Sequence, residues 1–257
     1  MVQLTALLIR KQKDAKSAIR RLEEQIGKAP ENADYPLLLA DLLVRNGENG
    51  KARQVLSKAA EKRPAVVTYR ARLADLDRIE GKRDKAIAAY ESIRKENPGD
   101  RAASLSLASL YEEKGNVEGA GKVYEDMMSR NPDDGVAANN LAFFYAEHAP
   151  APENLEKAEK LLTPFFEKSR GAPAIADTMA WIKFRKGDYE KARVLLEESV
   201  GTGGEMSPPM AYHLGMTLSR LGNKEKAVDY LAKAVNSGTN FPGKGEAEKT
   251  LKELKAK

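Results

Sequence analysis

Small and apolar residues recur along the chain with a fixed spacing. One column of this pattern holds alanine in seven successive copies, at Ala18, Ala52, Ala86, Ala120, Ala158, Ala192 and Ala227. Four prolines, Pro30, Pro64, Pro98 and Pro132, are each separated by 34 residues. That period is typical of an array of helix–turn–helix units. The pattern therefore predicts consecutive helix pairs and no strands.

Two further columns predict how the helices pack. A second small-residue column reads Ala6, Ala40, Ala74, Ala108, Ala142, Ala180 and Gly215. A large residue follows the first alanine column by four positions, at Leu22, Leu56, Tyr90, Tyr124, Leu162, Leu196 and Leu231. Small residues let two helices approach closely, and the large residue one turn away fills the space beside them. Both columns are therefore expected to be buried between helices.

Glycine and proline predict where the helices end. Gly47, Gly81, Gly115, Gly187 and Gly222 lie five residues before the alanine column, between the two helices of a copy. Glycine accepts the left-handed backbone that ends a helix, and proline cannot continue one.

These columns resemble the tetratricopeptide repeat family, whose motif runs W-x2-L-G-x2-Y, then A-x3-F, then P. The resemblance covers residues 1 to about 241, in copies at 1–32, 33–66, 67–100, 101–134, 135–172, 173–206 and 208–241. A charged helix at about 245–256 would cap the array. The resemblance implies an all-α fold, an α-solenoid with about seven helix pairs in a right-handed superhelix. We expect a single array over 1–257 with about fifteen helices.

Two places interrupt the strict period. Four extra residues fall in the turn from His148 to Asn154, which contains Pro150 and Pro152. The run from Gly201 to Gly204 replaces the proline that ends earlier copies. We expect the array to bend or soften at both places, with local mobility peaking there.

Composition excludes several kinds of site. The 257 residues include no cysteine, which excludes disulfides, thiolate zinc sites and a cysteine nucleophile. A net charge of +5 is too small to argue for nucleic acid. No stretch approaches the roughly 18 apolar residues of a membrane span. The run from Leu4 to Ile9 is too short for a signal peptide, although a leader could have been removed before Met1.

Catalytic motifs are missing from the chain. The two histidines, His148 and His213, lie in different copies, and no zinc-protease, serine-hydrolase or kinase signature occurs. The run from Gly238 to Gly245 matches a phosphate-binding loop in part. It has glycine where Ser or Thr should hold magnesium, and it follows a predicted helix, so a turn is expected instead. We therefore predict no enzyme activity, no cofactor and no metal.

The family resemblance implies a binding surface, because in this family the first helix of every copy lines the concave face. In copies two to four the face positions are Asp34, Leu37, Asp41, Val44 and Arg45, then Thr68, Ala71, Asp75, Arg78 and Ile79, then Ala102, Leu105, Ser109, Glu112 and Glu113. Copies five to seven carry an aromatic-rich set instead: Asn139, Asn140, Phe143, Trp181, Phe184, Arg185, Tyr212, His213, Met216 and Arg220. This set could hold an extended peptide or an amphipathic helix, with rings supplying contact area and amides pairing with backbone.

A structural alternative stays open for these rings, since Trp181 and Phe143 could simply pack between neighbouring copies. The family's clamp for a C-terminal carboxylate is not reproduced, because only Asn140 matches it. Acidic residues on the predicted face, such as Asp41 and Asp75, argue against RNA.

The family resemblance and the predicted binding face lead to two candidate functions. The first is a non-enzymatic adaptor that binds a peptide or protein segment within a bacterial multiprotein assembly. The second is a homo-oligomeric scaffold that uses the aromatic patch as a self-contact. The segment Asp177 to Leu254 also resembles bacterial repeat proteins of exopolysaccharide and envelope systems. A periplasmic or envelope location is therefore as consistent with the sequence as a cytoplasmic one.

Overall fold

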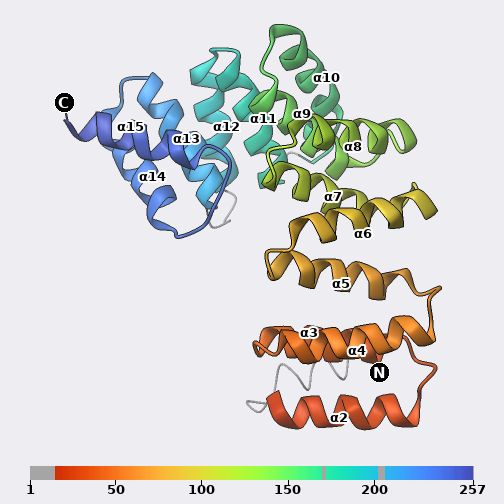
Figure 1. The fold of residues 1–257 in the computed structure, drawn as a ribbon. Helices are drawn as coiled ribbons and strands as arrows, with labels where there is room; N and C mark the ends of the chain where they lie inside the picture. Colours follow the sequence, from red (N-terminus) through yellow and green to blue (C-terminus); the bar gives the residue numbers. More distant parts are fainter. Residues whose placement is uncertain (1–14, 170–171, 202–205, 257) are drawn as a thin grey trace. The chain divides into compact units, whose positions relative to one another are not determined.

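The structure is a computed structural model that describes residues 15–169, 172–201 and 206–256. These residues form 14 helices, numbered α2 to α15, and no strands (Figure 1). The chain divides into two compact units, Met1–Val123 (unit 1) and Tyr124–Lys257 (unit 2), and each is described by itself. The all-α prediction is confirmed, while the single array over 1–257 stays a prediction.

Unit 1 consists of antiparallel helices in which each packs against the next along the chain (Figure 1). Its helices are α2 (Ala15–Lys28), α3 (Asp34–Arg45), α4 (Asn49–Lys62), α5 (Val67–Ile79), α6 (Arg83–Glu96) and α7 (Arg101–Glu113). The next helix, α8 (Val117–Arg130), begins in unit 1 and ends in unit 2. The first helix predicted for copy one, with Thr5 and Ala6, lies outside the described residues.

Unit 2 repeats the same arrangement and adds contacts between alternate helices. It contains α9 (Gly135–His148), α10 (Pro152–Lys168), α11 (Pro173–Arg185), α12 (Tyr189–Gly201), α13 (Pro208–Arg220), α14 (Lys224–Asn236) and α15 (Lys244–Ala256). Helix α11 contacts α9 and α13 in addition to its neighbours in the chain, and α15 packs against both α13 and α14. The first helices of successive pairs therefore lie side by side, and α15 covers the last pair.

The helices end where glycine and proline predict. Gly47, Gly81, Gly115, Gly187 and Gly222 all have positive φ, from 75° to 84°, and follow the first helix of a pair. The prolines of the 34-residue ladder each lie two residues beyond the end of a second helix. Helix N-termini are capped by side chains in several places: Asp134, for example, accepts hydrogen bonds from the backbone N–H groups of Val136 and Ala137.

The predicted small-residue columns form the interior. The seven alanines from Ala18 to Ala227 are all buried, and so is every described alanine of the second column. The large residues from Leu22 to Leu231 are buried beside them. This interior is the packed core that each helix pair makes with its neighbours, as the columns predict.

Gly215 shows why the second column changes from alanine to glycine in the last copy. A Cβ atom built on Gly215 in α13 would lie 2.7 Å from Cγ of Leu231 in α14. It would also lie 3.1 Å from the backbone nitrogen of that residue, which cannot rotate away. The closest approach of α13 and α14 therefore requires glycine at this position.

The insertion near His148 is not a longer turn, contrary to the sequence prediction. Helix α9 runs to His148 and α10 begins at Pro152, so three residues connect them, as in the other pairs. The extra residues instead lengthen the helices, and α10 has 17 residues where α8 has 14. Pro152 occupies the first turn of α10, where no N–H is needed, and Asn154 Nδ2 donates to the carbonyl of Ala149 at 3.0 Å. The other predicted mobile place includes 202–205, which lie outside the described residues.

Candidate functional site

A groove of about 580 Å³ lies on the face that first helices form in unit 1. Two helices, α3 and α5, make its walls, and the last residue of α7 closes one side. Its lining includes seven of the positions that the repeat register places on the binding face: Asp41, Val44, Arg45, Asp75, Arg78, Ile79 and Glu113. We call it the α3–α5 groove.

The floor of the α3–α5 groove is apolar. Ala40, Leu56 and Leu76 are buried there and belong to the core of unit 1. Ile79, at the end of α5, lies at the edge of the groove and is 56% exposed, the most exposed large hydrophobic residue of the described chain. An isoleucine left in water beside an apolar floor provides surface that a bound side chain could cover.

Most charges around the α3–α5 groove are paired across helices. Arg72 Nη1 lies 3.2 Å from Asp75, and its Nε lies 3.5 Å from Asp41 on α3. Arg78 on α5 pairs with Glu113 on α7. These pairs connect three successive first helices, so they fix the spacing of the face as well as its charge.

Asp75 has a second partner outside the lining, whereas one cation of the lining has no partner among the described residues. Tyr90, on α6, donates its hydroxyl hydrogen to Asp75 Oδ1, and the two oxygens are 2.6 Å apart. Burial first, and then this carboxylate, raises the pKa of Tyr90. Arg45 is exposed at the end of α3, and its guanidinium forms no ion pair or hydrogen bond with a residue that the structure describes. As far as the described residues go, Arg45 is therefore the lining cation that no carboxylate occupies.

Most rings of the aromatic set predicted in copies five to seven lie inside unit 2. Trp181 and Tyr212 are both 0% exposed, and Phe184, His213 and Met216 are also buried. The Trp181 ring stacks on Phe184 at 4.6 Å between centroids and on His213 at 4.1 Å. This burial is what the packing alternative predicts for Trp181. Buried rings contact no ligand unless the helices separate.

The polar atoms of these buried rings have partners within unit 2. Trp181 Nε1 donates to Glu147 at 2.9 Å, and Tyr212 Oη donates to Glu246 of α15 at 2.9 Å. In each pair the partners are 34 residues apart, one repeat length. Burial first, and then the charge of Glu246, raises the pKa of Tyr212. The rings therefore connect α9, α11, α13 and α15 instead of forming an open wall.

His213 forms a buried polar pair. Its Nδ1 lies 2.8 Å from Asp177 Oδ1, and both side chains are buried between α11 and α13. Asp177 and Trp181 are one helical turn apart, so both contact the same imidazole ring. The repeat register placed His213 on the binding face and did not reveal Asp177 as its partner. The sequence signal for this pair was the four-residue spacing of Asp177 and Trp181, which places both on the same side of α11.

Part of the predicted set is still accessible. Asn139, Asn140, Phe143 and Arg185 are partly exposed, and Arg220 is exposed. Arg185 donates from Nε to the carbonyl of Ala146 at 2.8 Å and lies 5.4 Å from the Trp181 ring centre, so it supports the packed rings. Among the described residues, the Asn139 Oδ1 atom is buried without a hydrogen-bond partner.

Within the described ranges no group of three or more His, Cys, Asp or Glu side chains is placed to hold a metal. Across those same ranges, no helix is both long and apolar enough to cross a membrane. Gly238 to Gly243 belong to the connection between α14 and α15, and Lys244 and Gly245 begin α15. A Cβ atom at Gly243 would lie 2.4 Å from the Tyr212 ring. These glycines therefore fit a close contact of backbone and ring, as a turn requires.

Comparison with known families agrees with the helix pairs. The tetratricopeptide repeat family matches at residues 10–76 and 78–142, and again at 208–237. The chain belongs to the tetratricopeptide repeat family. Proteins of this family generally act as non-enzymatic scaffolds, and the matches include no catalytic family.

Solved structures with the same fold include a tetratricopeptide repeat protein from Parabacteroides merdae. It is 20% identical, covers 99% of this chain and 97% of its own, and gives a TM-score of 0.72. PilF from Pseudomonas aeruginosa is 17% identical over 89% of this chain and 99% of its own, with a TM-score of 0.64. The APC/C heterotetramer Cut9–Hcn1 includes a chain that is 16% identical over 91% of this chain and 45% of its own, with a TM-score of 0.68. No curated protein sequence matches this chain.

Proposed function

We propose that this protein is a non-enzymatic adaptor that binds a peptide or protein segment along the face of its first helices, with the α3–α5 groove as a principal contact. The observation that carries the proposal is the groove itself, which combines an apolar floor, the exposed Ile79 and Arg45, a cation with no partner among the described residues. The family matches support protein binding in general, because tetratricopeptide repeats commonly mediate protein–protein interactions.

Each part of the groove has a distinct role in this proposal. Val44 and Ile79 cover an apolar side chain of the ligand, which removes their surfaces from water. Arg45 binds a carboxylate of the ligand through its two-pronged guanidinium. Arg72 and Arg78 stay paired to their carboxylates and hold the first helices at the spacing that an extended segment needs. The ligand is thus a segment with an apolar residue close to an acidic one.

The aromatic set enters this proposal in a smaller role than the sequence suggested. Its accessible members, Asn139, Asn140 and Phe143, form a separate contact on α9 of unit 2, with amides pairing to ligand backbone. The self-contact of a homo-oligomeric scaffold loses its main support, since the rings that would form it are buried. We therefore infer an adaptor within a multiprotein assembly, and the similar fold in the Cut9–Hcn1 heterotetramer likewise occurs within an assembly.

Selection of ligands from a displayed library of random linear peptides tests the proposal. Peptides enriched on the full chain should pair an apolar residue with Asp or Glu, and calorimetry would give their affinity. Ile79→Asp and Arg45→Glu should each weaken binding about tenfold, because each removes one of the two proposed contacts.

Val136→Asp is the matched control, because Val136 is 45% exposed on α9 and outside the α3–α5 groove. It should bind the peptides as the unchanged protein does. Enriched peptides that bind Ile79→Asp and Arg45→Glu with full affinity would refute the groove as the binding site.

A further inference from the structure

A second groove lies in unit 2, on a face that second helices form. It occupies about 670 Å³ between the second helices α8 and α10, with α9 beneath them. Leu141 of α9 is buried in its floor, and Leu161 and Phe165 of α10 are half-buried beside it. We call it the α8–α10 groove. It shares no residue with the α3–α5 groove.

Helix α10 presents one continuous stripe to the α8–α10 groove. Lys157, Lys160, Leu161, Pro164 and Phe165 all line it, and their spacing of three and four residues places them on one helix face. Pro164 is inside the helix and has no N–H, so the carbonyl of Lys160 lacks its usual helical donor. The stripe therefore offers an apolar surface, two cations and a backbone acceptor.

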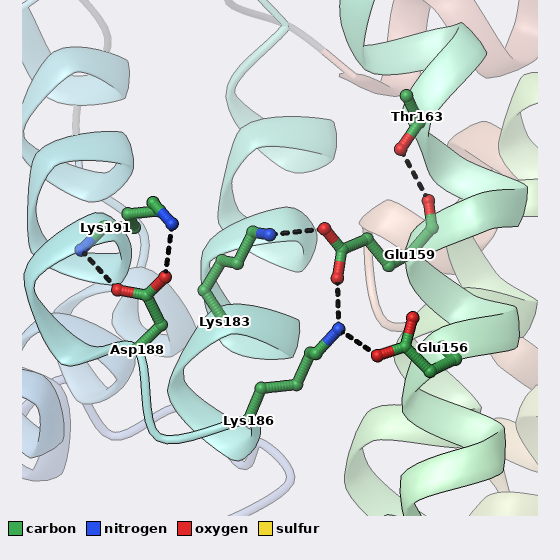
Figure 2. Close-up of polar contacts among 7 residues, drawn as sticks. All are labelled: Glu156, Glu159, Thr163, Lys183, Lys186, Asp188 and Lys191. Atoms are coloured by element: carbon green, nitrogen blue, oxygen red, sulfur yellow. Dashed lines mark hydrogen bonds and ion pairs between the residues drawn. The ribbon is translucent and has the colours of Figure 1, made fainter.

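A corresponding groove one helix pair further along the chain differs from the α8–α10 groove in the pairing of its lysines. That groove, of about 430 Å³, lies between the second helices α10 and α12, with α11 beneath them. Figure 2 shows that Lys183, which lines this groove, is bound to the carboxylate of Glu159. Lys186, just outside the lining, binds the same carboxylate. Burial alone would raise the pKa of Glu159, but the hydrogen bonds from both lysines outweigh it and lower the pKa.

The other lysine that lines this groove is paired as well: Lys191 Nζ lies 2.8 Å from Asp188 (Figure 2). The neighbouring Lys186 also donates to Glu156 at 2.5 Å. An acidic ligand would have to compete with these internal carboxylates.

The lysines of the α8–α10 groove have no such partners in the part of the chain that the structure describes. Lys157 and Lys160 are exposed, and neither side-chain amine forms an ion pair or hydrogen bond with a residue that the structure describes. Asp133 lies on the opposite wall, at the connection between α8 and α9. The α10 wall is therefore positive and the facing wall carries a carboxylate, so the groove favours a ligand with acidic residues on one edge only.

We propose that the α8–α10 groove docks a short amphipathic helix of a partner protein, with acidic residues along the edge that faces α10. Its apolar side chains cover Leu161 and Phe165, and its carboxylates pair with Lys157 and Lys160. This follows the general mode in which an amphipathic helix places its apolar face in a groove. It adds a second contact to the adaptor and does not depend on the α3–α5 groove.

Two synthetic helical peptides probe the groove, one of leucine and glutamate and the other with lysine in place of every glutamate. Fluorescence anisotropy with the full chain should show binding of the acidic peptide and at least tenfold weaker binding of the basic one. The double variant Lys157→Glu/Lys160→Glu should weaken binding of the acidic peptide about tenfold, since it replaces two attractions by repulsions.

Lys168→Glu/Lys252→Glu is the control of equal net charge, because both lysines are exposed and neither lines the groove. It should bind the acidic peptide like the unchanged protein, and so should Ile79→Asp. The chain has no cysteine, so a fluorescent label on Ser129→Cys at the groove edge reports local binding. The same label on Ser92→Cys in unit 1 should stay silent.

Three results would overturn the proposal. The acidic peptide could bind both lysine double variants equally, or bind no more tightly than the basic peptide. Alternatively, light scattering could show a dimer that Lys157→Glu/Lys160→Glu dissociates, which would make a second copy the occupant. Peptide binding that does not depend on Ile79 or Arg45 would refute the α3–α5 groove without affecting the tests of the α8–α10 groove. The two proposals can therefore be refuted independently.

Discussion

Removal of the Trp181 side chain should strongly destabilise unit 2. The indole is 0% exposed and stacks between Phe184 and His213, and its Nε1 donates to Glu147. Truncation of a fully buried Trp to Ala costs about 3–5 kcal/mol. Glu147 would also lose its indole donor, which adds to the cost because the carboxylate is largely buried. Trp181→Ala should therefore lie near the upper end of that range.

Urea unfolding followed by circular dichroism measures this loss. Trp181→Phe keeps an aromatic ring but removes the hydrogen bond, so it should cost about 1–3 kcal/mol. Arg220→Ala is the control from the same predicted site, and because Arg220 is exposed its effect should stay within about 0.5 kcal/mol. A Trp181→Ala protein that unfolds at the same urea concentration as the unchanged protein would refute the packing argument.

Two other predictions concern close packing and pH. Gly215→Ala should destabilise the fold by about 1–2 kcal/mol, because overlap with Leu231 outweighs the gain in helix propensity. Gly50→Ala, where a Cβ atom meets nothing within 4 Å, should be neutral or stabilising in the same thermal unfolding assay. Burial and the hydrogen bond to Glu125 raise the pKa of Tyr145 from 10.0 to about 12. The folded state thus holds the hydroxyl proton of Tyr145 more tightly than the unfolded chain does. The stability that comes from this difference is complete below pH 10 and is lost as pH rises through about 12. Tyr145→Phe should make the alkaline fall in stability shallower, and an identical pH profile would contradict this cause.

The repeat register predicted most of the fold and part of the site. Ala86 and Leu56 are buried because the columns mark positions where helices must approach. The same register placed Asp41, Arg45 and Ile79 on one face, and the structure gathers them in the α3–α5 groove. Periodicity succeeds here because it fixes which side of a helix each residue occupies.

The aromatic set shows where register alone is insufficient. Position on the first-helix face does not reveal whether the next pair covers a residue. Trp181 is covered because α9 and α13 both contact α11, an arrangement that depends on how closely successive pairs approach. The prediction for the insertion after His148 was wrong for a related reason, because extra residues can extend helices as well as turns. The α8–α10 groove had no sequence signal beyond the stripe on α10, because its walls come from different helix pairs.

Nuclear magnetic resonance gives the most direct test of the central claim, that ligands bind the first-helix face at the α3–α5 groove. The chain has one tryptophan, so its spectrum contains a single indole N–H signal, from Trp181. Titration of a selected peptide should shift the backbone amide signals of Arg45 and Ile79 and leave the indole signal in place. A peptide that moves the indole signal and leaves the amides of α3 and α5 unchanged would contradict the account.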